Sequence, residues 1–158
     1  MRGIIYYTLM THQSPVALFQ RWQSSIDDIR LVGATLLGAI SIVVGIYLPW
    51  LQSNPAREVI RHVYLPGMSS GLEFDVTLAL LLLIAVSVAM SILVGYSQFT
   101  AMIFVLTGLS SIALPSYLLL DIYAVYGGDF IPQIGSLLTI LGGTVVLVTG
   151  IAVFINKL

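Results

Sequence analysis

The chain has 158 residues, of which 58% are hydrophobic and 8% are charged, and it contains no cysteine. Soluble domains carry about 25% charged residues, so this composition excludes a monomer dissolved in water. The net charge of −1 excludes the strongly basic surface that is typical of nucleic-acid binding. The lack of cysteine excludes disulfides, thiolate metal sites and thiol nucleophiles.

Residues 1–30 form the expected cytoplasmic segment. Ser14 and Pro15 are typical of a helix start, and the apolar residues after them recur at helical spacing. These apolar positions are Leu18, Phe19, Trp22, Ile26 and Ile29. We predict an amphipathic helix that lies in the membrane interface, with Trp22 at the depth of the lipid headgroups. A cytoplasmic extension of the first span, packed on its own bundle, explains the pattern equally well.

The rest of the chain, residues 31–158, is dominated by four apolar stretches. They cover residues 31–51, 76–95, 99–120 and 134–155. About 20 apolar residues in a helix cross the hydrocarbon core of a bilayer, so each stretch is long enough to span. The sequence therefore predicts an all-α fold, a transmembrane four-helix bundle preceded by the amphipathic interfacial helix.

Small residues and one proline mark the two last spans. The last span carries a row of glycines, which we call the glycine seam and which consists of Gly135, Gly142, Gly143 and Gly150. Small residues let a second helix approach closely, either within one bundle or from another subunit. Pro115 lies inside the third span, where a proline frees a backbone carbonyl and usually kinks the helix.

The distribution of basic residues predicts the orientation. Four of the six Lys and Arg residues lie near the termini, and the other two, Arg57 and Arg61, lie in the first loop. This favours a multi-pass protein of the cell membrane with both termini in the cytoplasm, although a viral envelope protein has the same pattern. We expect the chain to start at Met1, with Met10 as the alternative start residue. We predict Tyr47, Trp50 and Tyr123 as anchors at the outer interface, with Trp22 at the inner one.

Few residues suggest chemistry. Asp121 lies at the end of the third span, and an ionisable residue near a membrane is a functional candidate. We expect it to form an ion pair with Arg57 or Arg61, the arginines of the first loop. A membrane enzyme would use Asp121 with His62, but the sequence has no HExxH or GxSxG motif and no phosphate-binding glycine loop. We therefore expect no catalysis, no cofactor and no metal.

The arrangement of these features resembles a known kind of protein. Leu48-Pro49-Trp50 closes the first span, a polar loop reaches Gly71 and Asp75, and a tight turn and a glycine-rich last span follow. Together they resemble small four-span membrane proteins of uncharacterised function in archaea and bacteria. Claudin-type proteins also have four spans and a tryptophan after the first, but the cysteine pair expected in their first loop is missing.

Two functions fit this pattern. The first is a non-catalytic structural or accessory subunit of a larger membrane assembly, with lipids and other membrane subunits, or a second copy, as partners. The second is a small oligomeric channel or transporter with its pore at the subunit interface. The second function predicts that the hydroxyl-bearing residues Thr107, Ser111 and Thr139 line water.

Overall fold

The computed structural model describes residues 15–57 and 64–156, with side chains from residue 29 onward. The chain divides into two compact units, residues 1–32 and 33–158. The described part of the first unit is helical and belongs to α1, Pro15–Tyr47. The predicted position of this segment in the interface depends on the side chain of Trp22, which lies outside the described residues. The two alternative start residues, Met1 and Met10, also lie outside the described residues.

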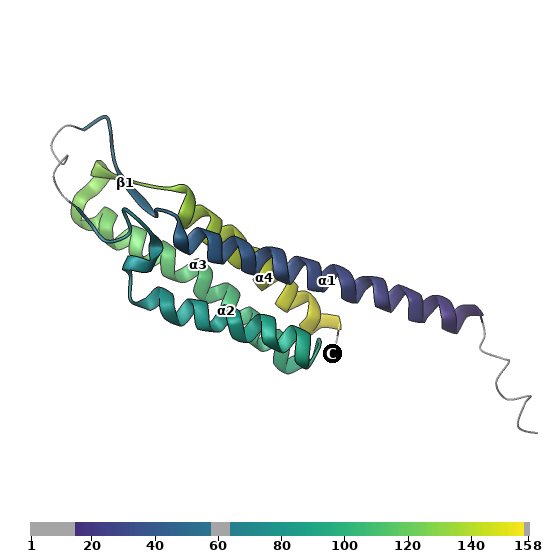
Figure 1. Ribbon diagram of the computed structural model, residues 1–158. Helices are drawn as coiled ribbons and strands as arrows, with labels where there is room; N and C mark the ends of the chain where they lie inside the picture. The colour runs from purple at the N-terminus through teal and green to yellow at the C-terminus, as the bar shows by residue number, and fades with distance from the viewer. Residues whose placement is uncertain (1–14, 58–63, 157–158) are drawn as a thin grey trace, which may run out of the picture. The chain divides into compact units, whose positions relative to one another are not determined.

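The second unit contains the C-terminal part of α1 and the remaining elements (Figure 1). The other long helices are α2, Val76–Leu93, α3, Gln98–Tyr126, and α4, Ile134–Asn156. Two short strands, β1 and β2, and two 3₁₀ turns, η2 and η3, lie in the connections. They cover Leu51–Ser53, Phe130–Pro132, Gly71–Glu73 and Gly127–Asp129.

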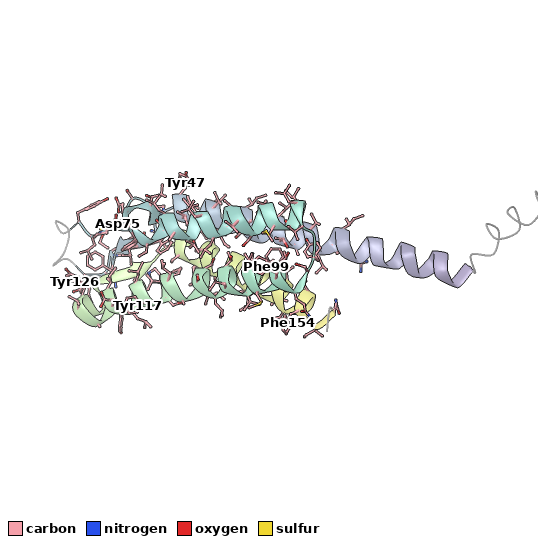
Figure 2. All side chains as sticks on the ribbon, turned by 90° about the horizontal axis from the view of Figure 1, so that it is seen from below. Tyr47, Asp75, Phe99, Tyr117, Tyr126 and Phe154 are labelled. Carbon is pink, nitrogen blue, oxygen red and sulfur yellow. The ribbon has the colours of Figure 1, made fainter. Side chains whose placement is uncertain are left out.

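Four helical segments in the described part of the chain are long and apolar enough to cross a membrane. They are Ile29–Tyr47, Val76–Leu93, Gln98–Asp129 and Ile134–Asn156. Large apolar side chains cover their outer faces (Figure 2), as expected where lipid is the solvent. The predicted all-α four-helix bundle is therefore confirmed.

Local residues explain where the helices begin and end. α1 ends at Tyr47, two residues before Pro49, because a proline disfavours helical backbone in the residue that precedes it. The N-cap of α3 is Ser97, whose side chain accepts a hydrogen bond from the backbone N–H of Thr100 at 3.2 Å. α3 continues past residue 120, where the predicted span ended, and stops at Gly127, whose φ of 60° suits glycine.

α4 packs closely against two neighbours through the glycine seam. A Cβ atom added to Gly142 would lie 2.6 Å from the carbonyl oxygen of Gly38 in α1. On another face of α4, a Cβ atom added to Gly143 would lie 2.7 Å from the Cβ atom of Ser111 in α3. Real Cβ atoms do not approach other atoms so closely, so both contacts require glycine. The seam is thus occupied by helices of the same chain.

Glycines on α1 meet glycines of the seam. Gly38 lies against Gly142, and Gly45 lies against Gly135, where an added Cβ atom would be 2.8 Å from the carbonyl oxygen of Gly45. The residue numbers rise along α1 while those of their partners fall along α4, so the two helices are antiparallel. The hydroxyl of Ser41, between the two glycine contacts, donates to the carbonyl of Leu138 at 3.1 Å.

The interior of the second unit combines apolar side chains with hydroxyl groups. A core of buried residues from all four helices includes Ile42, Leu80, Phe104 and Val146. Every buried polar side chain among the described residues is Ser or Thr. Most of these hydroxyls donate to carbonyls of their own helix. The hydroxyl oxygens of Ser87 and Thr107 also lie 2.7 Å apart across α2 and α3, where either hydroxyl can donate to the other in place of its carbonyl. Bonds of this kind satisfy polar groups where water is absent.

The close contact at Gly142 generates a stability prediction. We expect Gly142→Ala to lower the free energy of unfolding by about 1–3 kcal/mol, because the added methyl group overpacks the contact with the α1 backbone. Reversible unfolding of the detergent-solubilised protein would measure this change.

Gly33→Ala is the matched control, because no atom lies within 4 Å of a Cβ added to this helical glycine. We expect it to be neutral or to stabilise α1 by up to about 1 kcal/mol through its higher helix propensity. Equal effects of the two substitutions would contradict the packing described here.

Candidate functional site at the loop end

The loops on one side of the four helices form an ordered structure, which we call the loop end (residues 48–57, 64–75 and 127–133). β1 and β2 pair in antiparallel fashion, with Leu51 opposite Pro132 and Ser53 opposite Phe130. The side chain of Gln133 donates a hydrogen bond to that of Gln52. The pairing joins the connection after α1 to the connection before α4, so two loops that are distant in sequence are held together.

Trp50 fixes the first loop to the end of α1. Its side chain is 0% exposed, and its indole N–H donates to the carbonyl oxygen of Gly45 at 2.9 Å. The ring packs against Phe74, with the ring centroids 5.6 Å apart. Gly71 lies so close to the indole that an added Cβ atom would collide with it. The prediction of Trp50 as an interfacial anchor is therefore wrong: the ring is buried in protein because a glycine leaves room for it.

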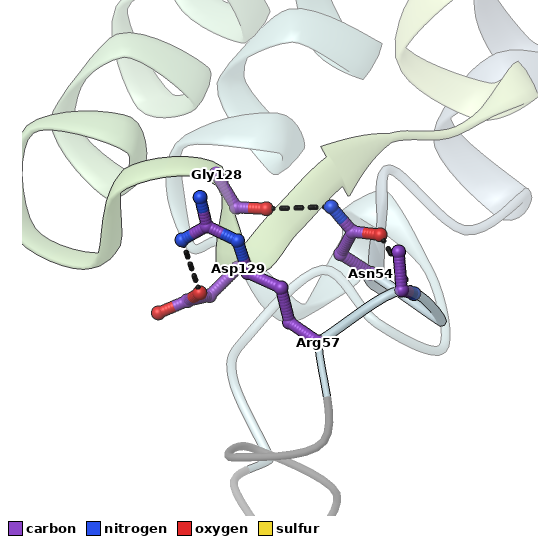
Figure 3. A network of polar contacts seen from close by, with 5 residues as sticks. Asn54, Arg57, Gly128 and Asp129 are labelled. Atoms are coloured by element: carbon purple, nitrogen blue, oxygen red, sulfur yellow. Dashed lines mark hydrogen bonds and ion pairs between the residues drawn. The ribbon is translucent and has the colours of Figure 1, made fainter.

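A polar network closes the outer surface of the loop end (Figure 3). The side-chain amide of Asn54 donates to the carbonyl of Gly128 at 2.8 Å, and the guanidinium of Arg57 pairs with the carboxylate of Asp129 at 2.9 Å. The ion pair is exposed to solvent, so its contribution to stability is at most about 1 kcal/mol. The ion pair instead fixes the position of the first loop relative to the turn after α3.

Glu73 organises the second half of the first loop. Its carboxylate accepts hydrogen bonds from the hydroxyls of Tyr64 and Ser69 and from the backbone N–H of Gly67. Partial burial raises the pKa of the carboxyl group, but the hydrogen bonds from Ser69, Tyr64 and the backbone together outweigh burial and lower the pKa below its ordinary value. The ionised form of Glu73 therefore holds this part of the loop in place.

The structure separates two residues that the sequence argument paired. Arg57 pairs with Asp129 and not with Asp121, whose side chain is exposed on α3. Arg61 and His62 lie outside the described residues. Sequence reasoning missed Asp129 because it reads as part of a Gly-Gly-Asp turn, and the only available signal was its position on the same side of the membrane as Arg57.

The other predicted residues lie as follows. Tyr47 and Tyr123 are 61% and 63% exposed at the ends of their helices, which suits the predicted interfacial position. Pro115 is buried inside α3, and the hydroxyls of Ser111 and Ser116 on either side of it donate to backbone carbonyls four residues earlier. Thr107, Ser111 and Thr139, the expected pore-lining residues, are at most 1% exposed and face the interior of their own chain.

Within the ranges that the structure describes, no group of three His, Asp or Glu side chains is placed to hold a metal ion. Comparisons with protein families, with curated proteins and with solved structures find no match to this chain. The fold and the site define a small multi-pass membrane protein.

The hydrogen bonds of Glu73 generate a pH prediction. Because the folded pKa is below the ordinary value of 4.5, the stabilisation is complete above that pH and is lost as the pH falls through the folded pKa. We expect the thermal unfolding midpoint to fall between about pH 5 and pH 3, and to fall less in Glu73→Gln.

Asp75→Asn is the control, because Asp75 lies two residues away and receives none of the hydrogen bonds described for Glu73. This variant should keep the pH profile of the unmodified protein. If Glu73→Gln keeps that profile as well, the carboxylate does not hold the loop.

Proposed function

We propose that this protein is a non-catalytic accessory subunit of a membrane assembly, and that it presents the loop end to its partner. The observation that carries this proposal is that noncovalent contacts between distant parts of the sequence hold the loop end together. β1 pairs with β2, Asn54 bonds to Gly128, and Arg57 pairs with Asp129. A surface ordered before binding loses less conformational entropy in a complex, which favours recognition by a protein partner.

The character of the interior also supports a structural role. The buried polar residues in the described part of the chain are Ser and Thr, and no ionisable residue is among the buried residues described. Proton relays and ion pathways use ionisable side chains inside the membrane. The glycine seam does not contribute to this argument, because α1 and α3 of the same chain already occupy it.

The alternative function, a pore between subunits, has less support. Its expected lining residues Thr107, Ser111 and Thr139 are buried within one chain, where each hydroxyl donates to a carbonyl of its own helix. A pore between subunits would have to be lined by the apolar side chains that cover the outer surfaces of the helices. The resemblance to small four-span prokaryotic proteins adds no functional residue to either alternative.

The proposal places the loop end outside the cell and both termini in the cytoplasm, on the basis of the basic residues near the termini. A single cysteine at the exposed position Ala56, in a chain that has no other cysteine, reports this orientation. Membrane-impermeant maleimide should label Ala56→Cys in intact cells. Labelling only after cell lysis would show the opposite orientation, with the loop end in the cytoplasm.

Site-specific photocrosslinking tests the partner directly. A photoreactive residue at Ala56 should capture a defined partner in the native membrane, and one at Leu82, which is 68% exposed on α2, should not capture that partner. Mass spectrometry would identify the product. Crosslinks from both positions to a second copy alone would contradict the accessory role and support the oligomeric channel.

A further inference from the structure

An open groove runs between the start of α2 and the middle of α3. It has a volume of about 420 Å³, and its walls are mostly apolar. It is lined by Val76, Ser110, Ala113, Leu114, Tyr117 and Leu118. Grooves that bind small molecules combine apolar walls with a few polar groups at fixed positions, which set the orientation of the ligand.

The lengths of the helices place this groove in one leaflet of the bilayer. α2 has 18 residues and is about 27 Å long, close to the thickness of the hydrocarbon core of about 30 Å. Its first residue, Val76, therefore marks the depth at which the hydrocarbon ends on the side of the loop end. Since Val76 lines the groove, the groove extends from the headgroup region into the acyl chains of the adjacent leaflet.

Two carboxylates belong to residues that are adjacent, along the helices, to residues lining the groove. On α3, Ser110, Leu114 and Tyr117 share one helical face, and Asp121 is the next residue on that face, about 6 Å beyond Tyr117. On α2, Asp75 directly precedes Val76. Asp75 and Asp121 are both exposed, and Figure 2 shows Asp75 and Tyr117 toward the loop end. An amphiphile in the groove would have its polar group on the side where these carboxylates lie.

The charge of the surroundings selects the headgroup. Residues 48–75 and 121–133 contain five of the seven Asp and Glu residues of the chain but two of its six Lys and Arg residues. One of these two cations, Arg57, is engaged by Asp129. A surface with this excess of negative charge repels anionic headgroups and attracts an ammonium group. The ring of Tyr117, which is 69% exposed beside the groove, adds a face for a cation–π contact.

We propose that this groove binds one phospholipid with an ammonium headgroup, phosphatidylethanolamine or phosphatidylcholine. One acyl chain lies along Leu114 and Ala113, and the ammonium group lies between Asp75 and Asp121. The site does not depend on the accessory role proposed above, since lipid would occupy it with or without a protein partner.

Native mass spectrometry of the full-length protein, released from nanodiscs of equal parts phosphatidylethanolamine and phosphatidylglycerol, tests this site. We expect one retained phosphatidylethanolamine per chain. Ala113→Trp should fill the groove and remove this lipid, and Ala85→Trp, at an exposed alanine elsewhere on α2, should retain it. Equal lipid retention by the two tryptophan variants would overturn the groove as the site.

The headgroup preference has its own control. Asp121→Asn should lower the ratio of bound phosphatidylethanolamine to phosphatidylglycerol by about fivefold, the effect of one charge near a membrane surface. Asp28→Asn makes the same change in net charge outside residues 48–75 and 121–133, so it should leave the ratio unchanged. Equal effects of Asp121→Asn and Asp28→Asn would overturn the assignment of the carboxylates.

Discussion

The close approach of α4 to its two neighbours is the constraint on which the rest of the structure depends. In lipid, helices gain no hydrophobic free energy by associating, so packing and interhelical hydrogen bonds must hold them together. The seam glycines allow backbone contact with α1 on one face of α4 and contact with α3 on another. The same contact extends to the loop end, where the backbone N–H of Gly135 donates to the carbonyl of Pro49 at 3.0 Å. Trp50 follows directly, so the position of the buried indole is set by the packing of the helices.

This dependence separates the roles of the interior and the surface. Inside, glycine and hydroxyl-bearing residues serve packing, and the buried hydroxyls of Ser87, Ser111 and Thr139 form hydrogen bonds to backbone carbonyls. Both proposed binding surfaces therefore lie on the exterior: the ordered loop end and the outer faces of the helices. Loops fixed by distant contacts are suited to recognition, because their geometry does not have to be established at the moment of binding.

The sequence predicted the architecture but not the loop end. Apolar length identifies the spans, and the glycines of the last span indicate close packing, because both signals are local along the chain. Trp50 after a span reads as an interfacial anchor, and its burial depends on Gly71 and Phe74, which only the folded loop brings to it. The pair of Arg57 and Asp129 joins residues 72 positions apart, so no local pattern reveals it. The sequence alone was also compatible with water-lining hydroxyls in the third and fourth spans, because the packing of the helices determines which face of each helix is buried.

The register of α1 against α4 is the most direct test of this account. The chain has no cysteine, so a pair of introduced cysteines gives an unambiguous crosslink. Mild oxidation of Ser41→Cys/Leu138→Cys should form a disulfide within one chain, because the Ser41 hydroxyl already reaches the backbone of Leu138. The pair Ser41→Cys/Leu141→Cys should stay reduced, since the side chain of Leu141 is 61% exposed. A crosslink in the second pair but not in the first, or crosslinks only between chains, would contradict the packing of α1 on the glycine seam.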